Sequence, residues 1–298
     1  MLLKKNTSRR SALRTLALTG TAAVTGTAIN PGHANAFARI QSTTSTALAI
    51  IGDESHNSDY IRTALRKTLV EEAGLSVDFS DVTDLISAEN LAHYKMLIIF
   101  RDGMVLPDGY NFAMYWQPGR GEEILSEPPL PPMRRGESTT WITEAQGKAI
   151  KAFVENGGAL WAWHNNSHLS LQNKDYRDVE GAVYAGHPRI RPYRVKIQNK
   201  THPIMKDVND FVVTDEQHYV QYDKDPKYIL ATSTYEGDGP IYKDSFDRES
   251  HTSESVWAYD YGKGRVCFMA PGHMITALWN PEYKKMQKNA IPWLLKKA

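Results

Sequence analysis

Histidine and carboxylate side chains in this sequence stand where they could exchange protons with a bound substrate. His164 directly follows the apolar run Ala159–Trp163, which has the pattern of a strand buried on both faces. An imidazole titrates near neutral pH, and beside a carboxylate it can take or give a proton under physiological conditions. We therefore expect acid-base catalysis, with His164 or Glu216 as the general base and His273 as its partner or as an electrostatic stabiliser.

Other polar side chains also follow apolar runs and are expected to contact the substrate. In open sheets of parallel strands, ligands bind beyond the carboxyl ends of the strands, so residues from distant parts of the chain can share one cleft. The expected substrate contacts are Asp53, His56, Arg101, Asp102, Asn165, Asp215 and His187.

Several histidines and acids have a simpler interpretation that the sequence leaves open. His56 could be a neighbour of a helix cap, and His187 and His202 could belong to turns beside prolines. The pair Asp215–Glu216 could open a solvated strand. Surface positions are expected for His93, His218 and His251.

A divalent metal ion is compatible with the histidine spacing. His164 and His168 are four residues apart, which on a helix places both on one face at ligand spacing. The other ligands of such a site, which would keep an open position for water, would come from His56, Glu216 or His273. His168 could equally be no more than part of the first turn of a helix, so the metal stays an open alternative.

The elements that must position these groups alternate between strand and helix. This alternation predicts an α/β fold with a doubly wound, mostly parallel sheet, helices on both faces and antiparallel additions in the second half. In chain order we expect strands at Ala47–Gly52, Leu75–Phe79, Met96–Phe100, Ala159–Trp163, Tyr193–Ile197, Asp215–Tyr219, Tyr228–Ser233, Ser255–Tyr259 and Gly264–Ala270. The expected helices are Tyr60–Ala73, Ile86–Leu91, Thr143–Asn156 and Pro281–Lys296.

Two segments interrupt the regular order. Residues 103–140 are rich in proline and aromatic residues and begin where a strand ends, so they form a long insertion placed to roof a pocket. Their aromatic rings would either stack on a ligand or tether the loop. Residues 236–255 are expected to be a charged polar loop, and Tyr184–Pro188 a turn.

Composition and charge narrow the classes of partner. The chain has 298 residues, of which 41% are hydrophobic, enough for one α/β domain over residues 37–298. The formal net charge is +1 with acids and bases interspersed, so a nucleic-acid partner is not expected. No segment is apolar enough to predict a stable membrane span. A homo-oligomer stays open.

The first 36 residues are expected to direct export. The stretch Ser8–Leu13 contains a twin-arginine pair, a mildly apolar run follows to about Ile29, and Ala34–Ala36 offers small residues for cleavage. The mature chain would begin near Phe37 in the periplasm or outside the cell. The alternative is a cytosolic protein with a disordered Ala/Thr-rich tail.

The only cysteine, Cys267, excludes an intramolecular disulfide. It lies in the strand pattern Arg265–Met269, which favours a small buried residue over a nucleophile.

An ordered set of short phrases resembles the trehalose-utilisation (ThuA-like) family. The phrases are Asn156-Gly157-Gly158 with the strand end at His164, Gly186-His187-Pro188, Thr201-His202-Pro203-Ile204, Asp215-Glu216, Tyr261 to Val266, Gly272-His273, Trp279 and Asn289 to Trp293. The resemblance implies a fold similar to flavodoxin and to class I glutamine amidotransferases, and a role linked to trehalose, related disaccharides or 3-keto sugars. It does not carry over the nucleophilic cysteine of the amidotransferases, because Trp163-His164-Asn165 stands at the corresponding turn.

Together these observations predict an exported protein that binds a small carbohydrate. The leading hypothesis is an enzyme, a hydrolase or a lyase or isomerase, using histidine and carboxylate groups on a sugar or keto-sugar. The alternative is a periplasmic sugar-binding protein without catalysis, and cysteine chemistry is disfavoured. A nicotinamide site is not expected, because Gly52–Ser55 after the first strand contains one glycine rather than a glycine-rich loop.

Overall fold

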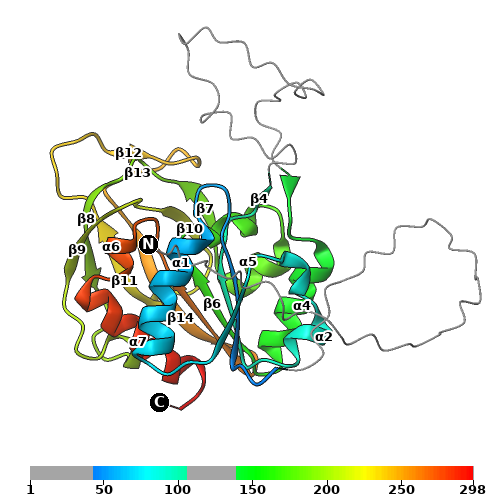
Figure 1. Ribbon diagram of the computed structural model, residues 1–298. Helices are drawn as coiled ribbons and strands as arrows, with labels where there is room; N and C mark the ends of the chain where they lie inside the picture. The colour runs from blue at the N-terminus through cyan, green and yellow to red at the C-terminus, as the bar shows by residue number, and fades with distance from the viewer. Residues whose placement is uncertain (1–42, 106–138, 298) are drawn as a thin grey trace, which may run out of the picture. The chain divides into compact units, whose positions relative to one another are not determined.

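The computed structural model describes residues 43–105 and 139–297 (Figure 1). The predicted signal segment, residues 1–36, lies outside the described residues, as does most of the predicted insertion 103–140. A nine-stranded sheet has the order β2-β1-β3-β6-β15-β14-β11-β8-β9, with helices on both of its faces. The predicted α/β fold class is confirmed.

The first five strands of this order are parallel to one another. Their apolar runs are buried on both faces, except at the edge strand β2, which explains why they read as continuous hydrophobic segments in the sequence. The chain passes from β1 to β2 on one side and then to β3 on the other, so the direction of winding reverses at β1. These strands are β1 (Ala47–Ile51), β2 (Val77–Ser80), β3 (Met96–Phe100), β6 (Ala159–Trp163) and β15 (Gly264–Met269).

Antiparallel strands extend the sheet beyond β15. They are β14 (Thr252–Tyr261), β11 (Ile229–Thr234), β8 (Arg191–Ile197) and β9 (Phe211–Asp215). Within the described residues, three small antiparallel ribbons lie outside the main sheet. They are formed by β7 (Ala182–Gly186) with β10 (Tyr219–Tyr222), β12 (Tyr242–Lys243) with β13 (Glu249–Ser250), and β4 (Met104–Val105) with β5 (Thr139–Thr140).

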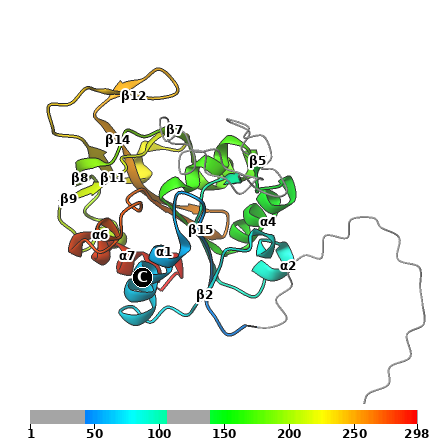
Figure 2. The same cartoon turned by 45° about the horizontal axis from the view of Figure 1, so that its top comes forward.

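The helices cover the two faces of the sheet and bury alternate side chains of its strands (Figure 2). One face packs against α1 (Ser58–Leu65) with its π-helical continuation Arg66–Glu71, α6 (Ile275–Leu278) and α7 (Pro281–Leu294). The other face packs against α2 (Ala88–Leu91), α4 (Glu144–Glu155) and α5 (Lys174–Glu180). The remaining helical turns are 3₁₀ segments at Thr83–Leu85, His164–Leu171, Pro203–Met205 and Pro226–Tyr228. No helix in the described ranges combines the length and apolar character needed to cross a membrane.

The helix before the central strand has clear local start and stop signals. Thr143 caps α4 by accepting the N–H of Gln146, whose side chain in turn accepts the N–H of Thr143, a capping box. The helix ends at Glu155 with Asn156 as its C-cap, and Gly157 follows with a φ of 113°, which favours glycine. These two ends fix where β6 begins, and therefore where His164 emerges.

Three local expectations are corrected. Residues 184–186 are the end of strand β7 rather than part of a turn, because they pair with β10. Asp215 ends strand β9 instead of starting a strand, and β10 begins only at Tyr219. Residues 236–255 are not one loop, since they contain the ribbon β12-β13 and the start of β14.

Glu180 is a fully buried carboxyl at the end of α5, away from the strand ends considered below. Its Oε2 accepts the Ser170 hydroxyl at 3.1 Å and the Ala182 N–H at 3.2 Å, whereas Oε1 has no partner. Burial raises the pKa of Glu180 to about 8, although these two hydrogen bonds oppose the shift.

This shift predicts that the protein loses stability as the pH rises. The folded chain holds the Glu180 proton up to about pH 8, whereas the unfolded chain releases it near pH 4.5. The stabilisation is therefore complete below pH 4.5 and is lost as the pH rises through 8. From pH 6 to pH 8.5 the unfolding free energy of the wild type should fall by about 2 kcal/mol more than that of Glu180→Gln. Urea denaturation measures this, with the exposed Glu249→Gln as control. Equal losses in wild type and Glu180→Gln would contradict the assignment.

Candidate functional site

His164 occupies a strained turn at the carboxyl end of β6. Its backbone φ is +51°, a region that side-chain-bearing residues rarely adopt and that costs about 1–3 kcal/mol. The imidazole is fully buried, and its Nδ1 lies 2.7 Å from the carbonyl oxygen of Ala270. Because a carbonyl only accepts, Nδ1 carries the proton and Nε2 of the neutral ring is left as an acceptor. Gly272 permits the close approach, since a Cβ there would lie 2.7 Å from the His164 Cβ.

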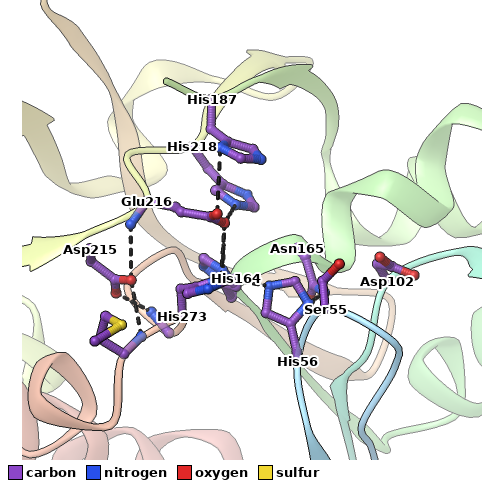
Figure 3. Close-up of polar contacts among 12 residues, drawn as sticks. Ser55, His56, Asp102, His164, Asn165, His187, Asp215, Glu216, His218 and His273 are labelled. Carbon is purple, nitrogen blue, oxygen red and sulfur yellow. Dashed lines mark hydrogen bonds and ion pairs between the residues drawn. The ribbon is translucent and has the colours of Figure 1, made fainter. Parts of the chain in front are cut away.

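Glu216, between β9 and β10, is the centre around which histidines gather (Figure 3). Its Oε2 lies 3.1 Å from His273 Nδ1 and 3.5 Å from the Nε2 atoms of both His164 and His218. His187 Nδ1 lies 3.8 Å from Oε1. The Glu216 side chain is only 13% exposed. One carboxylate is therefore shared by four imidazoles from four separate segments.

His56 joins this group from the loop after β1. Its Nε2 lies 3.1 Å from His273 Nδ1, and its Nδ1 lies 2.8 Å from Asp53 Oδ1. Asp53 also accepts the backbone N–H groups of His56 and Asp102 and the side-chain amide of Asn165. Asp53 thereby fixes the orientation of the His56 ring and ties the ends of β1, β3 and β6 together.

A cavity of about 210 Å³ opens onto these groups. It lies at the carboxyl ends of the parallel strands, where ligands bind in open α/β sheets. This volume is below the roughly 300–1,000 Å³ of pockets that hold drug-sized ligands, so it suits a small ligand. The lining residues are Ser55, His56, Asp102, Met104, Asn165, His168, Tyr184, His187, Glu216, His218 and His273.

A larger cavity of about 440 Å³ lies at the opposite end of the strands. Its walls come from α2, α4 and the end of α7, and they are mainly apolar. It contains none of the predicted site residues. The smaller cavity is therefore the better candidate for a functional site.

The cluster around Glu216 keeps negative charge on the carboxylate. Burial raises the Glu216 pKa, but the neighbouring imidazoles of His164, His218 and His273 outweigh burial and hold the pKa well below its usual range. Burial lowers the pKa of His218 to about 4 and that of His164 well below its usual value. The pKa of His273 is raised, because its ring contacts Glu216. The buried rings His164 and His218 are therefore neutral near pH 7.

Asp102 differs from Glu216 in its electrostatics. It is 5% exposed, and burial together with the neighbouring charge of Asp53 raises its pKa to about 7. Its Oδ1 accepts the Met104 N–H at 2.8 Å, and its carbonyl accepts the Trp141 indole N–H. Asp102 thus exchanges its proton close to neutral pH, in a position that lines the cavity.

The structure brings most of the predicted site residues together. Six line the cavity: His56, Asp102, Asn165, His187, Glu216 and His273. His164 and Asp53 do not line it, but their side chains contact residues that do. The last two predicted contacts, Arg101 and Asp215, lie apart from the cavity wall.

Arg101 and Asp215 have structural partners instead of a free face toward a substrate. The Arg101 guanidinium donates to the carbonyl of Gly52, which links the ends of β3 and β1. Asp215 is fully buried, and its oxygens accept the backbone N–H groups of Glu216, Gly272 and Met274. Asp215 thereby fixes the loop that carries His273.

Sequence reasoning missed the role of His218. It was expected at the surface but is 2% exposed and lines the cavity between His164 and His187. The spacing of Glu216 and His218, two residues apart as on one face of a strand, was an available signal. Tyr184, Ser55 and Met104 also line the cavity and carried no distinguishing pattern.

Three overlapping groups among the described residues have the donor atoms of a metal site. The largest comprises His56, His164, Glu216 and His273, with ligand atoms within 4.8 Å of one another. The others are His187, Glu216 and His218, and Asp53, His56 and Asp102. His168, expected to pair with His164, belongs to none of them; its ring contacts Tyr184 instead.

Comparison with known proteins gives consistent results. A family model described as trehalose utilisation, ThuA, matches residues 133–294, more than half of the chain. A ThuA-like protein from Bacteroides uniformis is 16% identical with a TM-score of 0.58, over 86% of this chain and 94% of that one. A ThuA-like protein from Parabacteroides merdae is 16% identical with a TM-score of 0.56, over 84% and 90%.

A β-galactosidase from Rahnella sp. R3 shares the fold over 84% of this chain and 31% of its own, with 15% identity and a TM-score of 0.50. At these identities the structural likeness concerns the fold alone. Among curated proteins, no sequence match was found.

Asp215→Asn tests how the His273 loop is held. Whichever way the new amide is oriented, its NH₂ group faces at least one backbone N–H that now donates to Asp215. We expect a loss of about 1–3 kcal/mol in unfolding free energy. Urea denaturation measures the loss, and the exposed Asp81→Asn serves as control. Unchanged stability in Asp215→Asn would show that these hydrogen bonds do not hold the loop.

Proposed function

We propose that this protein is a sugar-processing enzyme, starting from the fact that the chain belongs to the ThuA family of trehalose utilisation. Its substrate would be trehalose or a related sugar, including a keto-sugar. The cavity at the strand ends would hold one sugar ring. The single observation that carries the proposal is the Glu216 carboxylate surrounded by imidazoles at the wall of that cavity.

The cluster and Asp102 offer two complementary kinds of chemistry. The predicted catalytic residues His164, Glu216 and His273 form one contact group, within which a positive charge beside Glu216 is stabilised. Such a charge at the cavity wall would stabilise negative charge developing on a sugar oxygen. Asp102, with a pKa of about 7, is suited to give or take the proton.

For a keto-sugar this arrangement supports proton abstraction next to the carbonyl. The base removes a proton from the carbon beside the carbonyl, and the electron pair moves to the carbonyl oxygen. The positive charge beside Glu216 would stabilise the resulting enediolate. Transfer of the proton to the former carbonyl carbon, with one proton passing between the two enediolate oxygens, would give an isomer. Expulsion of the substituent on the next carbon, which takes up the abstracted proton, would give elimination. Both outcomes balance without an oxidant.

Sugar turnover is the direct test of this function. We expect the purified full chain to convert trehalose or its 3-keto derivative, followed by nuclear magnetic resonance. Glu216→Gln and Asp102→Asn should each lower kcat by about 100-fold or more, because one removes the charge at the cluster and the other the proton carrier.

His93→Ala is the matched control, because His93 is exposed and precedes β3, at the end of the strands opposite the cavity. Circular dichroism of each variant separates lost catalysis from lost folding. Sugar binding without conversion by the wild type would favour the non-catalytic sugar-binding alternative. Full turnover in both variants would remove these residues from the mechanism.

Export by the twin-arginine route is part of the proposal and rests on residues 1–36. Replacing both Arg9 and Arg10 by lysine should keep the full-length precursor in the cytoplasm, because the paired arginines are the recognised signal. Cell fractionation with an antibody against the chain measures this, and Arg14→Lys serves as control. A wild-type chain found only in the cytoplasm would contradict export.

A further inference from the structure

Two buried imidazoles direct unprotonated nitrogens into the same small space. His164 donates from Nδ1 to the Ala270 carbonyl, so its Nε2 is an acceptor, and this atom lies 3.5 Å from Glu216 Oε2 without a hydrogen bond. His56 Nδ1 lies 2.8 Å from the Asp53 carboxylate and 2.7 Å from the side-chain nitrogen of Asn165; donation to Asp53 leaves its Nε2 as an acceptor, 3.1 Å from His273 Nδ1. His164 Nε2 and Glu216 Oε2 are both acceptors, and two acceptors that face each other in a buried site need a proton or a metal ion between them.

We propose that His56, His164, His273 and Glu216 together bind one divalent transition-metal ion at the wall of the cavity. A single proton would join only one pair of these atoms. One metal ion in the centre would satisfy all four, because neutral imidazoles and an ionised carboxylate are the ligands such ions use.

The spacing of the four groups fits direct coordination. With metal–nitrogen bonds of about 2.0–2.1 Å, two ligands of a tetrahedral ion lie about 3.3 Å apart. The three contacts within the cluster measure 3.1 Å for His56–His273, 3.1 Å for His273–Glu216 and 3.5 Å for His164–Glu216. All four ligand atoms lie within 4.8 Å of one another, so small side-chain rotations suffice.

The outer contacts of two of the ligands are those typical of metal-binding histidines. Such residues usually donate their second ring N–H to a carboxylate or a backbone carbonyl, which fixes the tautomer and the ring orientation. His56 uses the Asp53 carboxylate and His164 the Ala270 carbonyl. Asp53 is itself fixed by the backbone N–H groups of Ser55, His56 and Asp102. The orientation of both rings is therefore set before any ion binds.

The donor set also narrows the class of metal. Three imidazole nitrogens with one carboxylate suit Zn²⁺, Fe²⁺, Co²⁺ or Ni²⁺, whereas Mg²⁺ and Ca²⁺ prefer sites made of oxygen ligands. His56, His273 and Glu216 line the cavity, so the ion would be accessible from it. The proposed function is needed only to identify the molecule that would contact the ion, namely a sugar through one of its oxygens. Metal binding itself does not.

Metal titration of the full chain tests the inference without any sugar. The protein is treated with a chelator, checked by circular dichroism, and titrated with Zn²⁺ and Co²⁺ by calorimetry. We expect one equivalent to bind, and the Co²⁺ form to show visible absorption typical of nitrogen and oxygen ligands. His56→Ala and Glu216→Gln should each weaken binding by more than about 100-fold.

Asp53→Asn tests the outer contact separately, because Asp53 orients His56 without being one of the four ligands. It should weaken binding by about 10–100-fold while retaining the one-to-one stoichiometry. His93→Ala, which alters an exposed histidine, should bind like the wild type.

Three results would overturn the metal site: no binding by the folded wild type at 1 mM metal, binding unchanged in both His56→Ala and Glu216→Gln, or tighter binding of Ca²⁺ or Mg²⁺ than of Zn²⁺. Sugar conversion by a chain that binds no metal would reject the metal and keep the proposed function. One-to-one metal binding without sugar conversion would reject the function and keep the metal.

Discussion

The candidate site depends on the removal of one carboxylate, Glu216, from water. A buried charge costs several kcal/mol unless it is paired and hydrogen-bonded. Here the neighbours are imidazoles, His218 from the same segment and His164, His187 and His273 from three others. Each ring must be oriented toward the same oxygen atoms, and this requirement fixes the loops at the carboxyl ends of the strands relative to one another. The cavity is the space left between these loops.

The backbone of the strands and loops also positions the site residues. His164 follows β6 in a turn, with a backbone φ of +51°. Gly272 lies close against His164 because glycine has no Cβ. Asp215, directly before Glu216, fixes the loop of His273 through backbone hydrogen bonds. Asp215 thus holds the loop, whereas the adjacent Glu216 faces the histidines. Strain and burial at this point are consistent with a site selected for chemistry rather than for stability alone.

The proposed sugar-processing role and the proposed metal ion depend on the same electrostatic feature of the site. A negative carboxylate surrounded by mostly neutral imidazoles requires a positive charge, and a substrate oxygen that gains negative charge requires the same. An ion held by His56, His164, His273 and Glu216 would meet both demands from a position open to the cavity. Asp102 is not one of these four ligands and lines the same cavity, where it could transfer a proton. Family membership directs attention to trehalose and related sugars.

The sequence by itself determined the strands, most helices and the position of His164, because hydrophobic periodicity and capping signals act over a few residues. Thr143 with Gln146 and the glycine pair after Asn156 fixed α4 and the start of β6 in this way. Only the tertiary structure decided that His218 is buried, that Arg101 and Asp215 serve the scaffold, and that His56 meets His273 across 217 positions. Those outcomes depend on the order of strands in the sheet and on which side chains share one low-dielectric space, and contacts between distant segments leave no local pattern in the sequence.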